Sequence, residues 1–213
     1  MSAARVLEYP YERIPALENG DVLDRAEFER RYKAMPDLKK AELINGVVYL
    51  GSPVYRDHYR SHVFAATWLG TYVAAHPELE IGDNGTVILD DEDNEVQPDL
   101  FLRRADGAST LTDETAVLGP PEFVMEISSS SASRDLHMKL ESYERAGVRE
   151  YVVWNVGDGE VLWFELDHGR FERRTPDGRG LLESRAFPGL RLLVDELIAE
   201  NLKAVLAALD GEL

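Results

Sequence analysis

Three acidic residues in this sequence have settings that suit phosphate or metal chemistry. Glu126 stands inside the apolar run 123–127, Asp99 directly precedes the apolar stretch 100–102, and Glu42 begins another strand-like segment. An ionised carboxylate is costly in a dry strand unless it is paired or holds a metal. For any one of these acids taken alone, an ordinary surface or strand-end position is the commoner explanation. Together they predict convergence at one end of a sheet, where hard oxygen ligands suit Mg²⁺ or Mn²⁺.

The helix predicted over residues 134–146 can supply a cation to this cluster. Asp135, Lys139 and Tyr143 are spaced at i, i+4 and i+8, so they share one helical face. A helix that starts soon after the Glu126 strand packs back against the sheet and can aim the Lys139 ammonium at the carboxylates. Phosphodiester hydrolysis uses this combination, because metal and ammonium both stabilise developing negative charge. The alternative is a surface ion pair between Asp135 and Lys139, worth about 0.2–0.5 kcal/mol.

Four segments in this order resemble the Uma2 family, also called DUF820, of restriction endonucleases in the PD-(D/E)XK superfamily. The resemblance covers roughly residues 40–165. It implies that Asp99 and Glu126 bind the metal, that the Ile127 main-chain carbonyl adds a ligand, and that Glu42 is the acid of the first core element. The segments are Glu42-Leu43-Ile44-Asn45-Gly46, Pro98-Asp99-Leu100, Glu126-Ile127-Ser128, and Asp135-x-x-x-Lys139-x-x-x-Tyr143-x-x-x-Gly147-Val148-x-Glu150-Tyr151.

The sequence departs from the superfamily pattern at residue 128. A standard E-x-K motif would place lysine there, and this chain has Ser128. The resemblance implies that the lysine has moved to the following helix, which nominates Lys139. Asn45 stands where the family often has aspartate, and the serine stretch lacks the proline often found there. The supporting residues that we nominate are Asp135, Tyr143 and His58, the last of which matches a histidine common in the family.

Two other sites have weaker support. His58 and His62 have the i, i+4 spacing of zinc ligands on a helix, but the sequence shows neither the acid of a zincin motif nor a third ligand. The serines 128–131 with Lys139 suggest a Ser/Lys nucleophile pair, but the glycines of a nucleophile elbow are missing. We therefore expect a turn or phosphate-adjacent role for these serines.

The composition limits the other classes of protein. The chain has 213 residues and no cysteine, which excludes disulfides and thiol nucleophiles. No apolar run approaches the roughly 20 residues of a membrane span, so we expect a cytoplasmic protein with no membrane partner. The net charge of −17 opposes nucleic-acid binding, since phosphate contacts need basic residues. Two features could offset it: a divalent metal, or a basic patch formed by Arg103, Arg104, Arg134 and Lys139.

The order of predicted elements favours an α/β fold. We expect a restriction-endonuclease-like mixed sheet around the Asp99 and Glu126 strands, flanked by helices over 57–76 and 134–146, with an antiparallel strand meander over 151–174. A helix over 194–209 closes the domain. Residues 103–119 are expected to form the longest loop. We expect residues 1–20 to be a tail or edge segment and residues 21–213 to be one nuclease-like domain.

The sequence thus predicts a Mg²⁺-dependent or Mn²⁺-dependent nuclease that hydrolyses phosphodiester bonds. The expected catalytic residues are Glu42, Asp99, Glu126 and Lys139, and the resemblance makes DNA the expected substrate. A homodimer is compatible with the sequence. Two alternatives stay open: an inactive nuclease fold that serves as a binding or regulatory module, and a serine-dependent hydrolase. Sensitivity to a chelator separates the metal-dependent nuclease from the serine-dependent hydrolase, because the latter would not need a metal.

Overall fold

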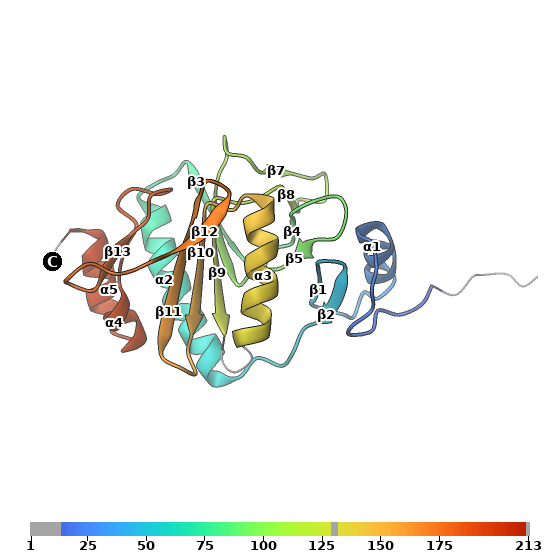
Figure 1. Cartoon of the computed structure of the whole chain (residues 1–213), viewed down its shortest axis with the longest axis horizontal. Helices are drawn as coiled ribbons and strands as arrows, with labels where there is room; N and C mark the ends of the chain where they lie inside the picture. Colours follow the sequence, from blue (N-terminus) through green and yellow to red (C-terminus); the bar gives the residue numbers. More distant parts are fainter. Residues whose placement is uncertain (1–13, 129–131, 212–213) are drawn as a thin grey trace, which may run out of the picture.

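The computed structural model of the chain describes residues 14–128 and 132–211; for residues 132–137 it describes only the backbone. The described residues form helices and three β-sheets, and the expected α/β class is confirmed (Figure 1). None of the helices in these residues is long and apolar enough to cross a membrane. The helices are α1 (Arg25–Lys33), α2 (Arg56–Ala74), α3 (Ala132–Ala146), α4 (Val194–Ile198) and α5 (Leu202–Leu209).

The larger sheet is mixed and contains the strands of Asp99 and Glu126. Only the β9–β10 pair is parallel, and the other pairs are antiparallel. Strands β10 to β12 form the predicted meander. In spatial order the strands are β12 (Arg170–Arg174), β11 (Glu160–Asp167), β10 (Glu150–Asn155), β9 (Phe123–Ser128), β6 (Leu100–Arg104) and β3 (Leu79–Asp83).

Helices α2 and α3 cover opposite faces of this sheet. Met125 and Ile127 on β9 pack in the core that contains Trp68 of α2, whereas Val124 packs with Tyr143 of α3. Side chains alternate between the faces of a strand, so Glu126 lies on the same face as Val124, beneath α3. The alternation of side chains along β9 therefore places the Glu126 carboxylate under α3, the helix that carries Lys139.

A second sheet lies beside α3 and carries Glu42. Its strands in spatial order are β2 (Val47–Leu50), β1 (Ala41–Ile44), β5 (Glu95–Val96), β4 (Val87–Ile88), β8 (Val117–Leu118) and β7 (Thr110–Leu111). The Asn45-Gly46 turn joins β1 to β2, and both of its residues have positive φ, as a two-residue type I′ hairpin requires. The acids thus come from two sheets, and the prediction that all three converge at one end of a single sheet is wrong.

Two further predictions about the elements were wrong. Residues 103–119 are not one loop, because they contain β7 and β8. The closing helix over 194–209 is divided into α4 and α5: Glu200 has a φ of 56°, and the Asn201 side chain accepts a hydrogen bond from the Ala204 N–H and so begins a new helix.

The C-terminal part packs against α2. Strands β13 (Leu181–Glu183) and β14 (Arg191–Leu193) form a separate antiparallel pair, and α5 contacts both β14 and α2. Trp68 is fully buried there, and its indole N–H donates to the Arg191 carbonyl at 2.8 Å. This packing fixes α2 against the sheet. The predicted domain boundaries, 21–213 with a preceding segment 1–20, stay a prediction, and residues 1–13 lie outside the described part.

Candidate active site

The site begins where β6 and β9 separate. Leu100 pairs with Met125, and continuing this antiparallel register by one residue places Asp99 opposite Glu126. Strand β6 begins at Leu100, whereas β9 continues to Ser128. The Asp99 carboxylate fills part of the resulting gap, because its Oδ2 accepts a hydrogen bond from the Ile127 N–H at 2.8 Å. The two predicted metal-binding acids are therefore neighbours on one face of the sheet.

Lys139 connects two of the acids. Its Nζ donates to Glu126 Oε1 and to Glu42 Oε1, both at 2.9 Å. The residue is only 8% exposed, which is incompatible with a surface ion pair. Helix α3 thus carries the lysine into the cluster, as predicted. Asp135 lies outside the described side chains.

Two further donors hold the glutamates in place. The fully buried Tyr143 donates its hydroxyl to Glu126 Oε1 at 2.9 Å. The main-chain N–H of Gln97 donates to Glu42 Oε1 at 2.8 Å, which joins the residue after β5 to β1, its neighbour in the second sheet. Both oxygens that face Lys139 accept a second hydrogen bond, so the geometry of the cluster is strongly constrained.

Asp99 has two basic neighbours. His58 Nε2, from the first turns of α2, lies 3.6 Å from Asp99 Oδ1, and Lys40 Nζ lies 3.8 Å from the same oxygen. The sequence analysis missed Lys40. Its position two residues before Glu42 was the available signal, because residues i and i+2 of a strand point to the same side. The donor role of the Gln97 backbone had no signal in the sequence.

The cluster contains more carboxylates than cations, and burial makes this imbalance costly. Burial raises the pKa of Glu126 to about 7; Lys139 opposes the shift, and the nearby Asp99 and Glu42 add to it. Burial would also raise the pKa of Glu42, but Lys139 and Lys40 outweigh it and lower that pKa. Burial alone would lower the pKa of Lys139, yet Glu126 and Glu42 hold it well above its usual value. The ammonium is therefore permanently charged, and Glu126 is the acid that keeps a proton near neutral pH.

The expected basic patch does not form. Arg103 is buried at the far end of β6, where its guanidinium pairs with Glu80 and donates to Ser109. Arg104 donates to the Ala186 carbonyl, and Lys139 is bound to its two glutamates. Three of the four basic residues are thus engaged inside the protein, and the side chain of Arg134 lies outside the described set. The patch that could offset the charge is therefore not supported by the described side chains, because Arg103, Arg104 and Lys139 each have a partner within the fold.

The other candidate sites find little support. The rings of His58 and His62 are 5.9 Å apart, but each faces a different aspartate, Asp99 and Asp83 respectively. Among the residues whose side chains are described, no group of three or more His, Cys, Asp or Glu could hold a metal ion. The two histidines therefore do not face one shared metal position, and the same result holds for Asp99 and Glu126 with their described neighbours. Of the predicted serine cluster, residues 129–131 lie outside the described part.

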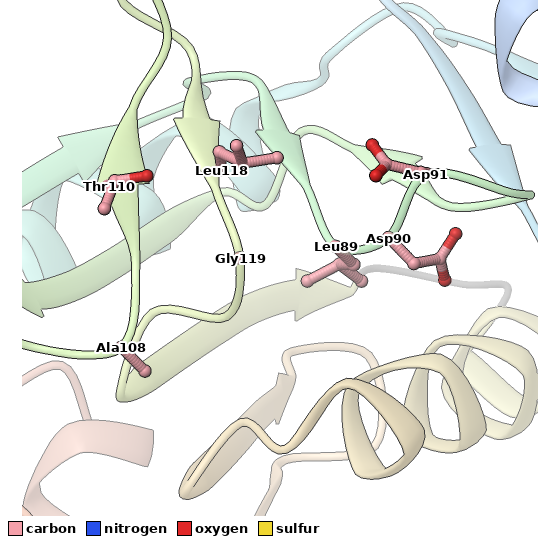
Figure 2. A pocket seen from close by; sticks show the side chains of 7 residues that line it. All are labelled: Leu89, Asp90, Asp91, Ala108, Thr110, Leu118 and Gly119. Carbon is pink, nitrogen blue, oxygen red and sulfur yellow. The ribbon is translucent and has the colours of Figure 1, made fainter.

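A shallow hollow between β4 and the β7–β8 pair is separate from this cluster (Figure 2). Asp90 is the acid at its margin, and its carboxylate already accepts hydrogen bonds from three backbone N–H groups, from the Asn94 side chain and from Arg145. The other polar side chains in its lining are those of Asp91 and Thr110. It is lined by Leu89, Asp90, Asp91, Ala108, Thr110, Leu118 and Gly119.

Comparisons with known proteins bear on the fold and the family of the chain. The fold is a mixed α/β fold of the nuclease type. The model of the Uma2 family, described as "Putative restriction endonuclease", matches residues 25–195. The chain therefore belongs to the Uma2 family.

One similar solved structure is that of a "putative nuclease belonging to DUF820" from Anabaena variabilis. The two chains superpose with a TM-score of 0.64 and share 12% sequence identity; the match covers 80% of this chain and 96% of the other. This likeness supports the fold. No curated protein matches the chain.

Proposed function

We propose that this protein is a metal-dependent nuclease that hydrolyses phosphodiester bonds, with DNA as its substrate. The observation that carries the proposal is the contact of Lys139 Nζ with both Glu42 and Glu126, beside Asp99, which directly precedes the neighbouring strand β6. A buried lysine held by two acids is a costly arrangement that a purely structural role would not need. Perturbed titratable groups that gather around one point are typical of catalytic sites.

The gap between β6 and β9 suits a magnesium or manganese ion. Asp99 and Glu126 would provide two carboxylates. In an extended strand the N–H and C=O of one residue point to the same side, so the Ile127 carbonyl faces Asp99 together with the N–H that Asp99 accepts. Mg²⁺ is usually held by one or two carboxylates with water and phosphate oxygens as its other ligands.

When bound, such an ion supplies Lewis-acid stabilisation to the phosphate. The residues of the chain have complementary tasks. Lys139 keeps its proton and directs a fixed positive charge at the scissile group, and Tyr143 holds Glu126 in the orientation that faces the gap. Glu42 holds Lys139 in place from the second sheet, which makes Glu42 a positioning residue in this mechanism.

The raised pKa of Lys139 argues against the serine-hydrolase alternative. A lysine that activates a serine must be neutral when it accepts the proton, whereas this ammonium is stabilised by two carboxylates. The binding-module alternative has one observation in its favour: the net charge of −17 without the predicted basic patch.

A cleavage assay tests the proposal. Purified protein is incubated with single-stranded and double-stranded DNA and RNA in the presence of Mg²⁺, Mn²⁺ or EDTA, beside the variant Asp99→Asn. We expect the wild type to cleave with either ion. We expect no cleavage in EDTA and none by the variant. Cleavage by the variant would assign the activity to another site or to a contaminant. Failure of the wild type on every substrate would favour the binding module.

A further inference from the structure

The first turns of α2, which also contain His58, carry two exposed aromatic side chains. The sequence Tyr55-Arg56-Asp57-His58 is followed by Tyr59-Arg60-Ser61-His62. Tyrosine, arginine and histidine therefore each recur four residues later, about one helical turn. Tyr55 is 74% exposed and Tyr59 is 54% exposed. The Tyr59 N–H donates to the Tyr55 carbonyl at 3.1 Å, which places the two residues one turn apart on the same side of the helix.

The histidine of the first repeat connects this face to the site. His58 Nε2 lies 3.6 Å from Asp99 Oδ1, and Tyr59 is the next residue along the helix. The face formed by Tyr55 and Tyr59 therefore begins within one helical turn of a residue that contacts the proposed metal ligand.

Positive charge at the same place suits a phosphate backbone. Arg56 is exposed, and its guanidinium lies 3.7 Å from the carboxylate of the similarly exposed Asp57 beside it. Such a pair contributes little and exchanges readily for another anion. Tyr55 is the N-cap of the 19-residue helix α2, and no side chain caps that end among the described contacts. The N–H groups of the first turn are thus available to a phosphate oxygen.

We propose that this face binds unpaired nucleobases, so that the preferred substrate is a single-stranded nucleic acid; the inference rests on the proposed function. Aromatic side chains stack on bases only when the bases are exposed, as they are in a single strand. Duplex binding instead depends on neutralising many phosphates, and Arg103, Arg104 and Lys139 are engaged inside the protein. Stacking on Tyr55 and Tyr59 would provide affinity that the acidic chain cannot obtain from charge.

Binding of labelled oligonucleotides tests the proposal. The protein carries Asp99→Asn to prevent cleavage, and fluorescence anisotropy with Mg²⁺ measures its Kd for single-stranded DNA, single-stranded RNA and duplex DNA. The test variant is Tyr55→Ala/Tyr59→Ala. Two control pairs change the same positions: Tyr55→Phe/Tyr59→Phe keeps the aromatic rings, and Tyr55→Leu/Tyr59→Leu keeps apolar bulk without rings. A third control, Leu111→Ala, removes an exposed apolar side chain from β7, in the sheet that carries Glu42.

We expect the alanine and leucine pairs to weaken single-strand binding by roughly tenfold or more, and the phenylalanine pair and Leu111→Ala to leave it unchanged. The melting temperature should be the same in all variants, because these side chains are exposed. Comparison of the DNA and RNA arms identifies which single strand is preferred. Duplex binding as tight as single-strand binding would overturn the proposal. A change of oligomeric state in the alanine pair, with nucleic-acid binding unaltered, would overturn it in favour of a subunit interface.

The two proposals can fail separately. If the wild type cleaves nucleic acid and the alanine pair binds it normally, the stacking surface is wrong and the nuclease assignment stands. If single strands bind through the rings but the wild type cleaves nothing, the stacking surface stands and the nuclease assignment fails.

Discussion

Lys139 reaches Glu126 across 13 residues of sequence, from a helix that packs on the face of the strand carrying the glutamate. The same ammonium contacts Glu42, which is 97 residues distant in sequence and lies in another sheet. One buried cation therefore holds together three elements of the fold: β1, β9 and α3. Most of the expected consequences of mutation follow from this arrangement.

The first prediction concerns stability. Lys139→Met keeps the aliphatic bulk but leaves Glu42 and Glu126 buried without their cation, so it should lower the free energy of unfolding by about 3–5 kcal/mol. Adding Glu126→Gln should recover a large part of that loss, because the double variant buries one fewer carboxylate. Urea denaturation of the wild type, both single variants and the double variant measures the coupling. Additive effects would show that the two side chains do not interact.

The second prediction concerns pH in the metal-free protein. The pKa of Glu126 is raised to about 7 in the folded state, so the folded chain binds this proton more tightly than the unfolded chain does. The contribution of Glu126 to stability should therefore be largest below about pH 4.5 and should fall as pH rises to about 7. Glu42, whose pKa is lowered, acts oppositely, and its contribution is lost only below about pH 4.5.

Thermal unfolding in EDTA can isolate the Glu126 part of this dependence. The difference in melting temperature between the wild type and Glu126→Gln should grow in favour of the variant between about pH 5 and about pH 8. Parallel curves for the two proteins across this interval would show that Glu126 has an ordinary pKa.

The third prediction separates the structural and chemical roles of Asp99. Asp99→Asn keeps an oxygen that can accept the Ile127 N–H, so the fold should be retained while activity falls by at least roughly 100-fold. Asp99→Ala removes that acceptor as well and should also reduce stability, by about 1–3 kcal/mol. Circular dichroism melts and cleavage rates for the pair provide the comparison. An active Asp99→Asn protein would remove Asp99 from the mechanism.

The fourth prediction concerns the packing beneath the site. A methyl group at Gly82 would overlap the ring of Phe101, which lies in the same core cluster as Tyr143. Gly82→Ala should therefore cost about 1–3 kcal/mol. Gly70 in α2 has open space around it, and Gly70→Ala should stabilise the chain by about 0.5–1 kcal/mol. Equal effects of the two substitutions on the unfolding free energy would contradict this account of the packing.

Local sequence signals predicted the elements around the site well. Asp24 stands three residues before Glu27, the spacing of an N-terminal helix cap, and its carboxylate accepts the Glu27 N–H at 2.8 Å. The apolar run around Glu126 and the helix that carries Lys139 were also found at their predicted places. These predictions succeeded because caps and hydrophobic periodicity depend on residues only a few positions apart.

Long-range pairing was predicted less well. Nothing local indicated that Glu42 belongs to a different sheet from Glu126, or that the Gln97 N–H donates to Glu42. Arg103 was assigned to a surface patch because its partners Glu80 and Ser109 become visible only when the strands pair. The roles of Asp99, Glu126 and Ile127 as metal ligands, and of Glu42 and Lys139 in catalysis, stay predictions.

The most direct test of the central claim is a crystal structure of the protein soaked with Mn²⁺, with anomalous diffraction used to locate the ion. The account predicts an anomalous peak in the gap between β6 and β9, bound by the carboxylates of Asp99 and Glu126 and the carbonyl of Ile127, and absent from Asp99→Asn crystals. A peak confined to the Asp90–Asp93 loop, or no peak near Asp99 at saturating Mn²⁺, would contradict it.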